Sequence, residues 1–173
     1  IVAEGIRGGA LGFSTSRTIA HKTRKGEHTP TLGAAEGELR AIAEALRGVG
    51  AGWMQVISDF DDPDDEFAML RRVAKASGQV MSTQLLQRAN RPELWRQILG
   101  KIEAANRDGT RILGQVMGRP IGLMLGFELS QHPFVTRPSW RAIADLPFAE
   151  KLAILRQPEF RARLLSEPTA DPL

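Results

Sequence analysis

The residue types best suited to chemistry follow a short apolar stretch near the start of the chain. Gly9 to Phe13 is apolar and glycine-rich, and Ser14 to Thr18 then supply five consecutive polar side chains. Parallel α/β proteins bind their ligands at the carboxyl ends of strands. A buried strand ending at Phe13 would therefore deliver hydroxyl groups and the Arg17 guanidinium to a site. The alternative is a strand followed by a hydroxyl-rich turn.

Two further polar segments could carry chemistry. His21 and His28 lie in a long polar excursion between Arg17 and Leu32, where they could be ligands or proton carriers, although isolated loop histidines are more often solvated. The acidic run from Asp61 to Glu66 could bind a cation. Acidic residues in the first turn of a helix also cap its free N–H groups and complement its dipole, and we favour this second interpretation.

The elements that must position these residues follow a β-α rhythm. Apolar runs predict strands, and apolar residues at helical spacing between them predict helices, so the fold class is α/β with a right-handed parallel sheet and helices outside. The predicted strands are 10–13, 53–57, 79–82 and 111–117. The predicted helices are 1–6, 34–46, 64–77, 92–106 and shorter ones near 139–144, 147–155 and 158–165. A glycine- and proline-punctuated segment after Met117 is typical of a loop that covers a pocket mouth.

Composition narrows the class of protein. With 173 residues, 42% hydrophobic and 25% charged, the chain suits one globular domain. It has no cysteine, which excludes disulfides and thiolate metal ligands and fits a cytoplasmic protein. No apolar stretch is long enough to cross a bilayer, so we expect no membrane association. The 23 basic and 20 acidic residues are interspersed and aromatics are few, so we expect no nucleic-acid partner.

Common catalytic motifs are absent from the sequence. It contains no phosphate loop, no HExxH or HxH metal pair and no Ser-His-Asp pattern. The glycines between Gly5 and Gly12 precede a strand and lack the spacing of a dinucleotide site, so that site is rejected. From its residues alone, the sequence predicts a fold class but no catalytic reaction.

The run from Gly9 to Thr18, followed by His21-Lys22-Thr23 and Pro30-Thr31, resembles a segment of the N-acyl-D-amino-acid deacylases of the amidohydrolase superfamily. The similarity covers residues 1 to about 145, with weaker signals at 119–123 and 132–134. It implies a (β/α)8 barrel in which a metal ion at the carboxyl ends of the strands activates water to attack an amide carbonyl.

The chain departs from the family pattern at the metal. The family carries a ligand histidine at the end of each of the next two strands, but these ends read Val56-Ile57-Ser58-Asp59 and Met81-Ser82-Thr83-Gln84. Zinc or another divalent metal would then be held by residues outside this chain, and we identify no metal ligands within it. The chain therefore resembles an internal fragment of a TIM-type barrel with about four β-α units at 1–117. A covering loop and helices at 118–166 and a loose tail at 167–173 would follow in the same single, incomplete domain.

The resemblance implies a hydrolase that deacylates an N-acyl amino acid or a related small amide, and a non-catalytic ligand-binding barrel is the alternative. Asp59 is the candidate acid or base, or else the N-cap of the helix that begins near Asp64. Arg17 is a candidate for binding a substrate carboxylate, or else forms a surface ion pair. The implied substrate-binding residues are Ser14, Thr15, Arg17, Ser58, Gln84 and His132. We expect the isolated fragment to be inactive and, because of its open sheet edge, to aggregate or form a homo-oligomer such as a dimer.

Overall fold

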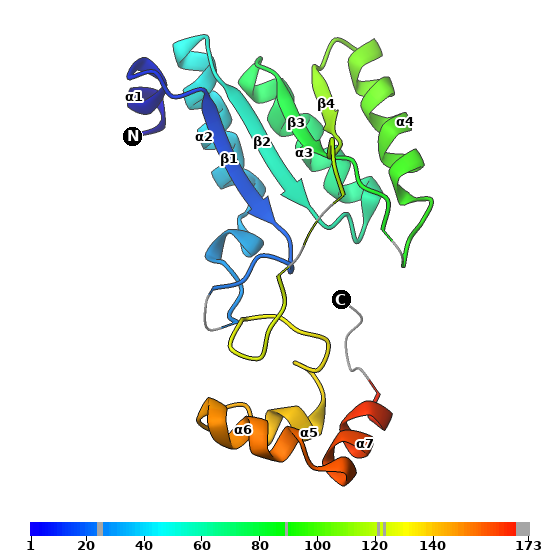
Figure 1. Cartoon of the computed structure of the whole chain (residues 1–173). Helices are drawn as coiled ribbons and strands as arrows, with labels where there is room; N and C mark the ends of the chain where they lie inside the picture. The colour runs from blue at the N-terminus through cyan, green and yellow to red at the C-terminus, as the bar shows by residue number, and fades with distance from the viewer. Residues whose placement is uncertain (24–25, 89, 121, 123, 169–173) are drawn as a thin grey trace. The chain divides into compact units, whose positions relative to one another are not determined.

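A computed structural model describes residues 1–23, 26–88, 90–120, 122 and 124–168 (Figure 1). The chain divides into two compact units. Unit 1 comprises 1–21 and 28–121, and unit 2 comprises 22–27 and 122–173. Each has a hydrophobic core of its own and is described by itself.

Unit 1 contains a parallel four-stranded sheet in which strands alternate with helices, which confirms the predicted α/β class. The strands lie side by side in chain order, β1-β2-β3-β4. Its elements are α1 (Val2–Arg7), β1 (Gly12–Arg17), the 3-10 helix η1 (Pro30–Gly33), α2 (Glu36–Val49), β2 (Trp53–Ser58), α3 (Pro63–Ser77), β3 (Met81–Gln84), α4 (Leu94–Arg107) and β4 (Ile112–Gln115).

The helices α2, α3 and α4 cover one face of this sheet (Figure 1). Residues at alternate positions of the strands, such as Met54, Val56 and Met81, are fully buried on that side. They pack against the apolar stripes of the helices, where Leu70 and Leu46 are also fully buried. The periodicity in the sequence therefore located this core correctly.

The helix ends follow from local chemistry. The Asp62 carboxylate accepts hydrogen bonds from the backbone N–H groups of Asp64 and Asp65, both at 3.0 Å, so it is the N-cap of α3. This confirms the capping interpretation of the acidic run for Asp62. At the other end of α2 and α3, Gly50 and Gly78 have φ values of 74° and 63°, a left-handed conformation that favours glycine.

The structure corrects the predicted bounds of the first strand. The prediction ended it at Phe13, whereas β1 continues from Gly12 to Arg17, so the polar run lies within the strand and not beyond it. The prediction also had the strand buried on both faces. β1 is an edge strand with one uncovered face, and Ser14 is exposed there. A strand in that position can carry polar side chains at alternate positions without burying them.

β2 matches its predicted range to within one residue, whereas β3 is shifted and β4 is shortened relative to the sequence prediction. β3 begins at Met81, two residues later than expected, and β4 ends at Gln115. α4 begins at Leu94 rather than at Pro92. Apolar runs mark burial, whereas strands are bounded by pairing with their neighbours, and the two differ at the ends of a sheet.

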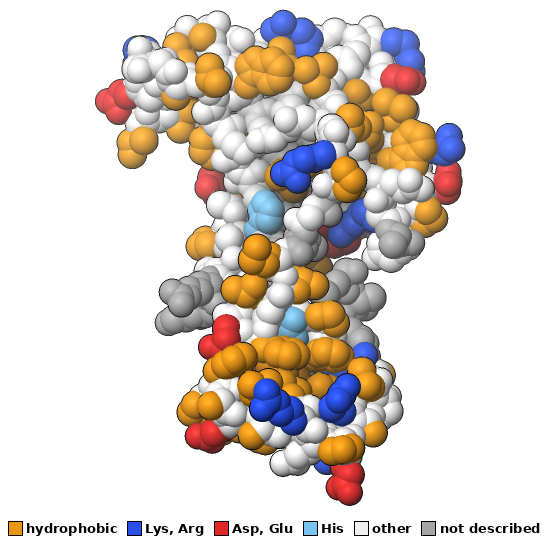
Figure 2. All heavy atoms as spheres, viewed as in Figure 1, with side chains coloured by type: hydrophobic (Ala, Val, Ile, Leu, Met, Phe, Trp, Pro, Cys, Tyr) orange, Lys and Arg blue, Asp and Glu red, His pale blue; other side chains and the backbone are white. Residues whose placement is uncertain are grey.

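Within the described part of unit 1, no helix covers the face of the sheet opposite α2, α3 and α4. Leu11, Trp53 and Leu113 are 89%, 51% and 44% exposed. Figure 2, drawn from the same side as Figure 1, shows hydrophobic side chains at the surface over this part of unit 1. A parallel sheet is normally covered on both faces, so the uncovered face is the unusual feature of this fold.

Unit 2 is built from short helices, as the sequence predicted: α5 (Pro138–Arg141), α6 (Phe148–Leu155) and α7 (Pro158–Ser166). Trp140, Ile143, Phe160 and Leu164 form its core. In the described part of 118–137 the chain forms no helix or strand. Residues 169–173, most of the predicted loose tail, lie outside the described residues. No helix in the described part of the chain combines the length and apolarity needed to cross a membrane.

Candidate functional site

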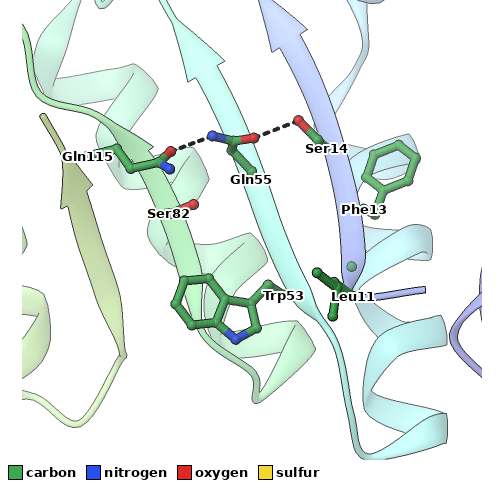
Figure 3. Close-up of a pocket in the computed structure, with 8 residues that line it drawn as sticks. Leu11, Phe13, Ser14, Trp53, Gln55, Ser82 and Gln115 are labelled. Carbon is green, nitrogen blue, oxygen red and sulfur yellow. Dashed lines mark hydrogen bonds between the residues drawn. The ribbon is translucent and has the colours of Figure 1, made fainter. Parts of the chain in front are cut away.

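An open hollow of about 550 Å³ lies on the uncovered face of the sheet (Figure 3). Most of its lining residues come from the N-terminal and middle parts of the strands, while Leu11 precedes β1 and Gln115 ends β4, and none is charged. They are Leu11, Gly12, Phe13, Ser14, Trp53, Gln55, Ser82 and Gln115. An uncharged lining of apolar surface with a few hydrogen-bonding groups suits a neutral part of a small molecule.

A row of hydrogen bonds crosses this hollow from one edge of the sheet to the other. The Ser14 hydroxyl donates to Gln55 Oε1 at 2.8 Å, and Gln55 Nε2 donates to Gln115 Oε1 (Figure 3). Ser82 lies between Gln55 and β4 in the sheet register, and its small side chain lets the two glutamines meet. Amide and hydroxyl groups are therefore fixed side by side across β1, β2 and β4.

Asp59, the candidate acid or base, follows β2 at the carboxyl edge and is 9% exposed. Its Oδ1 accepts from the Thr18 hydroxyl at 2.7 Å and from Arg88 at 3.4 Å, and its Oδ2 accepts from the Ile19 N–H at 2.7 Å. The carboxylate thus ties the segment after β1 to the end of β2. It does not cap α3, because Asp62 does.

Arg17, the candidate for binding a substrate carboxylate, already has a carboxylate partner within the chain. Its Nη2 lies 2.9 Å from Glu66 Oε1, with the two side chains 18% and 22% exposed, and its Nη1 donates to the Ala34 carbonyl. The Ser58 hydroxyl donates to the other oxygen of Glu66 at 2.6 Å. Arg17 and Ser58 are register partners, so Glu66 of α3 joins the ends of β1 and β2.

Gln84 takes the place of missing backbone pairing between β2 and β3. The two strands pair only at Met54–Met81 and Gln55–Ser82. Beyond that point the Ser58 N–H donates to Gln84 Oε1 at 3.1 Å, and Gln84 Nε2 donates to the Ser58 carbonyl. This side-chain amide therefore continues the ladder where the backbones separate.

Of the two remaining predicted site residues, Thr15 of unit 1 does not line the hollow, and His132 belongs to the core of unit 2. Thr15 is 8% exposed and pairs in register with the core residue Val56, so it faces the helix layer. His132 is buried in unit 2, where its ring lies 4.2 Å from that of Trp140 and its Nδ1 accepts from the Phe134 N–H at 3.2 Å. Of the predicted substrate-binding residues, Ser14 alone lines the hollow.

Sequence reasoning missed Gln55 and Gln115, the central residues of the polar row. Both interrupt apolar runs that were interpreted as buried strands, and a polar residue between apolar neighbours was the available signal. Sequence reasoning also missed the contact between the side chains of Ser16 and His21. Ser16 Oγ lies 2.6 Å from His21 Nδ1, which places one excursion histidine at the carboxyl end of β1.

The strand ends do not fit a metal ion. In the part of the chain that the structure describes, no three His, Cys, Asp or Glu side chains come together as a metal site requires. The ends of β2 and β3 offer Ser58, Asp59 and Gln84. The Ser58 hydroxyl already donates to Glu66, and Gln84 Oε1 accepts from the Ser58 N–H. Comparison with known proteins adds no assignment, since no protein-family model, curated protein or solved structure matches the chain.

Proposed function

We propose that the sheet of unit 1 is half of a TIM-type (β/α)8 barrel whose uncovered face lines the barrel interior. The observation that carries this proposal is the combination of strand order with helix placement. Doubly wound sheets reverse their strand order and carry helices on both faces. Here the order is sequential and α2, α3 and α4 lie on one face, as in a barrel wall. The barrel proposal concerns unit 1 alone, because unit 2 has a core of its own.

Within that barrel, we infer that the chain supplies one wall of an amide hydrolase of the N-acyl-D-amino-acid deacylase type. The row of Ser14, Gln55 and Gln115 provides donors and acceptors that match an amide group. Exposed Trp53 and Leu11 beside it offer apolar surface to an acyl chain. The substrate class that fits this lining is an N-acyl amino acid or another small amide.

The chain's own residues bind and orient in this proposal, and no chemical step is assigned to them. Asp59 is held by Thr18, Ile19 and Arg88, which together make three of the roughly four hydrogen bonds that an ionised carboxylate can accept. The metal that the resemblance implies finds no fitting set of ligands among the described residues. Ser16 and His21 are the polar pair best placed to contact a substrate at the carboxyl edge.

The engaged state of Asp59 favours a second candidate function. A barrel related to amidohydrolases could bind the same small amide without hydrolysing it, and then Asp59 would serve only to join β1 to β2. Both functions place the ligand on the same face of the sheet. They therefore predict the same binding and differ only in whether the ligand is hydrolysed.

One experiment tests both candidates. N-acetyl-D-leucine and its L enantiomer are titrated into the protein by calorimetry, and release of acetate and leucine is measured with and without added zinc. Because the isolated chain is expected to be inactive, release is measured on the full-length protein. There, binding with product release supports the hydrolase, and binding alone supports the ligand-binding barrel. Gln55→Leu should weaken binding, while Gln97→Leu on the exposed surface of α4 serves as the matched control. If the protein neither binds the amide nor releases product, both proposals are contradicted.

A further inference from the structure

Ser16 of β1 shares a face of the sheet with the residues of the hollow. Side chains along a strand alternate between its two faces, and residues two apart point the same way at a separation of about 7 Å. Ser14 lines the hollow on the uncovered face, whereas Thr15 is buried on the helix side. Ser16 therefore lies on the uncovered face, one step nearer to the carboxyl edge than the polar row.

His21 provides a base for the Ser16 hydroxyl. Its Nδ1 lies 2.6 Å from Ser16 Oγ. With the ring proton on Nε2, this Nδ1 accepts a hydrogen bond from the hydroxyl. Ser16 is half-buried and His21 is exposed, so a ligand can reach both side chains. A hydroxyl with a base within hydrogen-bond distance is the arrangement that makes serine a nucleophile.

The turn that carries His21 is held against the end of β2. The Asp59 carboxylate accepts hydrogen bonds from the Thr18 hydroxyl and from the Ile19 N–H, each at 2.7 Å. Thr18 accepts from the Ala20 N–H at its Oγ1, at 3.1 Å, and from the His21 N–H at its carbonyl, at 3.4 Å. A buried carboxylate thus anchors the turn, and His21 is fixed at the carboxyl end of β1.

The direction of the ligand on this face indicates which bond lies at the pair. In the proposed function, the polar row holds the amide of an N-acyl amino acid. Leu11 and Trp53 offer apolar surface to the acyl chain on the amino-terminal side of the row (Figure 3). The other end of the ligand, the carboxyl end of the amino acid, therefore points along β1 toward Ser16.

We propose that Ser16 and His21 cleave esters and amides formed at the carboxyl group of N-acyl amino acids. Ser16 Oγ bonds to that carbonyl carbon and gives its proton to His21 Nδ1, which passes the proton to the alcohol or amine as its bond to the carbon breaks. Water then attacks the ester on Ser16, and its proton returns through His21 to Ser16 Oγ as the free acid leaves. Water is the only co-reactant. The inference rests on the proposed function for the position of the ligand amide.

A fluorophosphonate, which reacts covalently with serine nucleophiles, tests the pair in the full-length protein. Mass spectrometry of the tryptic peptide that ends at Arg17 should place the label on Ser16 and not on Ser14. His21→Gln removes the base and should slow labelling about tenfold or more, while His28→Gln should change it less than about twofold. His28 is the matched control because it is exposed in the same excursion. Circular dichroism checks that each variant is folded.

The p-nitrophenyl esters of N-acetyl-D-leucine and its L enantiomer test the activity. Release of nitrophenol should exceed the rate in buffer, and Ser16→Ala should abolish this excess. Ser166→Ala, at an exposed position of α7, should retain it and is the matched control. A zinc chelator should leave the release unchanged, because no step at Ser16 uses a metal.

The outcomes separate this inference from the proposed function. A Ser16 that takes no label, or labelling that His21→Gln leaves as fast, would overturn the catalytic pair, and the contact would then serve only to fix the turn on β1. Binding of N-acetyl-D-leucine without label on Ser16 would leave the proposed function standing. Label on Ser16 and ester cleavage without binding of N-acetyl-D-leucine would support the pair and contradict the proposed function alone.

Discussion

Gly12 lies against the backbone of β2 at Trp53. A Cβ placed on it would overlap the Trp53 carbonyl oxygen and lie 2.8 Å from the Trp53 carbonyl carbon and nitrogen, all atoms of a neighbouring backbone. Gly12→Ala must therefore displace β1, and we expect a loss of about 1 to 3 kcal/mol in the free energy of unfolding. Urea denaturation measures this.

Gly37 provides the matched control for that substitution. It lies in α2, and a Cβ placed on it would have no atom within 4 Å. Gly37→Ala should raise the free energy of unfolding by up to about 1 kcal/mol, since alanine favours the helix. Equal effects of the two substitutions would contradict the close approach at Gly12.

Arg17 lies in the run that resembles the deacylase segment. A substitution there tests whether Arg17 binds substrate or stabilises the fold. Arg17→Gln removes the ion pair with Glu66 and leaves that half-buried carboxylate with Ser58. We expect a loss of about 1 to 3 kcal/mol in stability and no change in the affinity for N-acetyl-D-leucine. Arg40→Gln, which breaks an exposed pair with Glu44, should change stability little. Lost affinity in a stable Arg17→Gln protein would instead favour a substrate-binding role.

Individual residues show where sequence reasoning was strong and where it failed. The helix-cap role of Asp62 could be predicted because it depends on neighbours within three positions. The partners of Arg17 and Asp59 lie 17 to 49 positions away, and only the folded chain specifies them. Gln55 and Gln115 became a pair through strand order and register, which single-strand patterns do not contain.

At the scale of elements, the segment around His132 in unit 2 should respond to pH. Burial and then the nearby Lys151 ammonium lower the pKa of His132 below its ordinary value of 6.5. Lys151 is itself paired with Glu128 at 3.2 Å. Protonation of Nδ1 would also break the hydrogen bond from the Phe134 N–H. The neutral ring is therefore the form that this fold stabilises.

The sign of the effect follows from that lowered pKa. Above pH 6.5 His132 is neutral in both states, and as the pH falls below 6.5 the unfolded chain takes up the proton first. The free energy of unfolding of unit 2 should thus fall with pH until the folded-state pKa is passed. Glu167, whose pKa is lowered from 4.5 by its hydrogen bond from Ser139, contributes only at lower pH.

Thermal melts between about pH 5 and 7 measure this dependence, followed by tryptophan fluorescence in a Trp53→Phe, Trp95→Phe background so that Trp140 alone reports on unit 2. His132→Gln keeps an acceptor for the Phe134 N–H but carries no titrating group, so it should remove most of the dependence. His28→Gln, at an exposed position, is the control and should keep it. A wild-type stability that rises as the pH falls would contradict the buried neutral ring.

For the whole molecule, the α/β class and the order of elements followed from hydrophobic periodicity, because each helix stripe and each buried strand position is set locally. The uncovered face of the sheet did not follow. A strand buried on both faces and a strand of a half-covered sheet share apolar residues at every second position, and they differ only at residues such as Gln55. The division into two units was also unforeseen, because the glycine- and proline-punctuated segment after Met117, where unit 1 ends, was interpreted as a covering loop of the same domain.

The two separate cores predict how the whole molecule unfolds. Leu70 belongs to the core of unit 1 and Leu164 to that of unit 2, and both are nearly inaccessible to solvent. Leu70→Ala and Leu164→Ala each remove the same buried atoms and should cost about 2 to 5 kcal/mol in their own unit. Scanning calorimetry of the full chain should then resolve two transitions, with Leu70→Ala lowering one midpoint and Leu164→Ala the other. Acidification toward pH 5 should lower only the transition that Leu164→Ala moves, because His132 lies in that unit. A single transition shifted equally by both substitutions would mean that the two cores unfold as one, and the pH effect would then extend to the sheet.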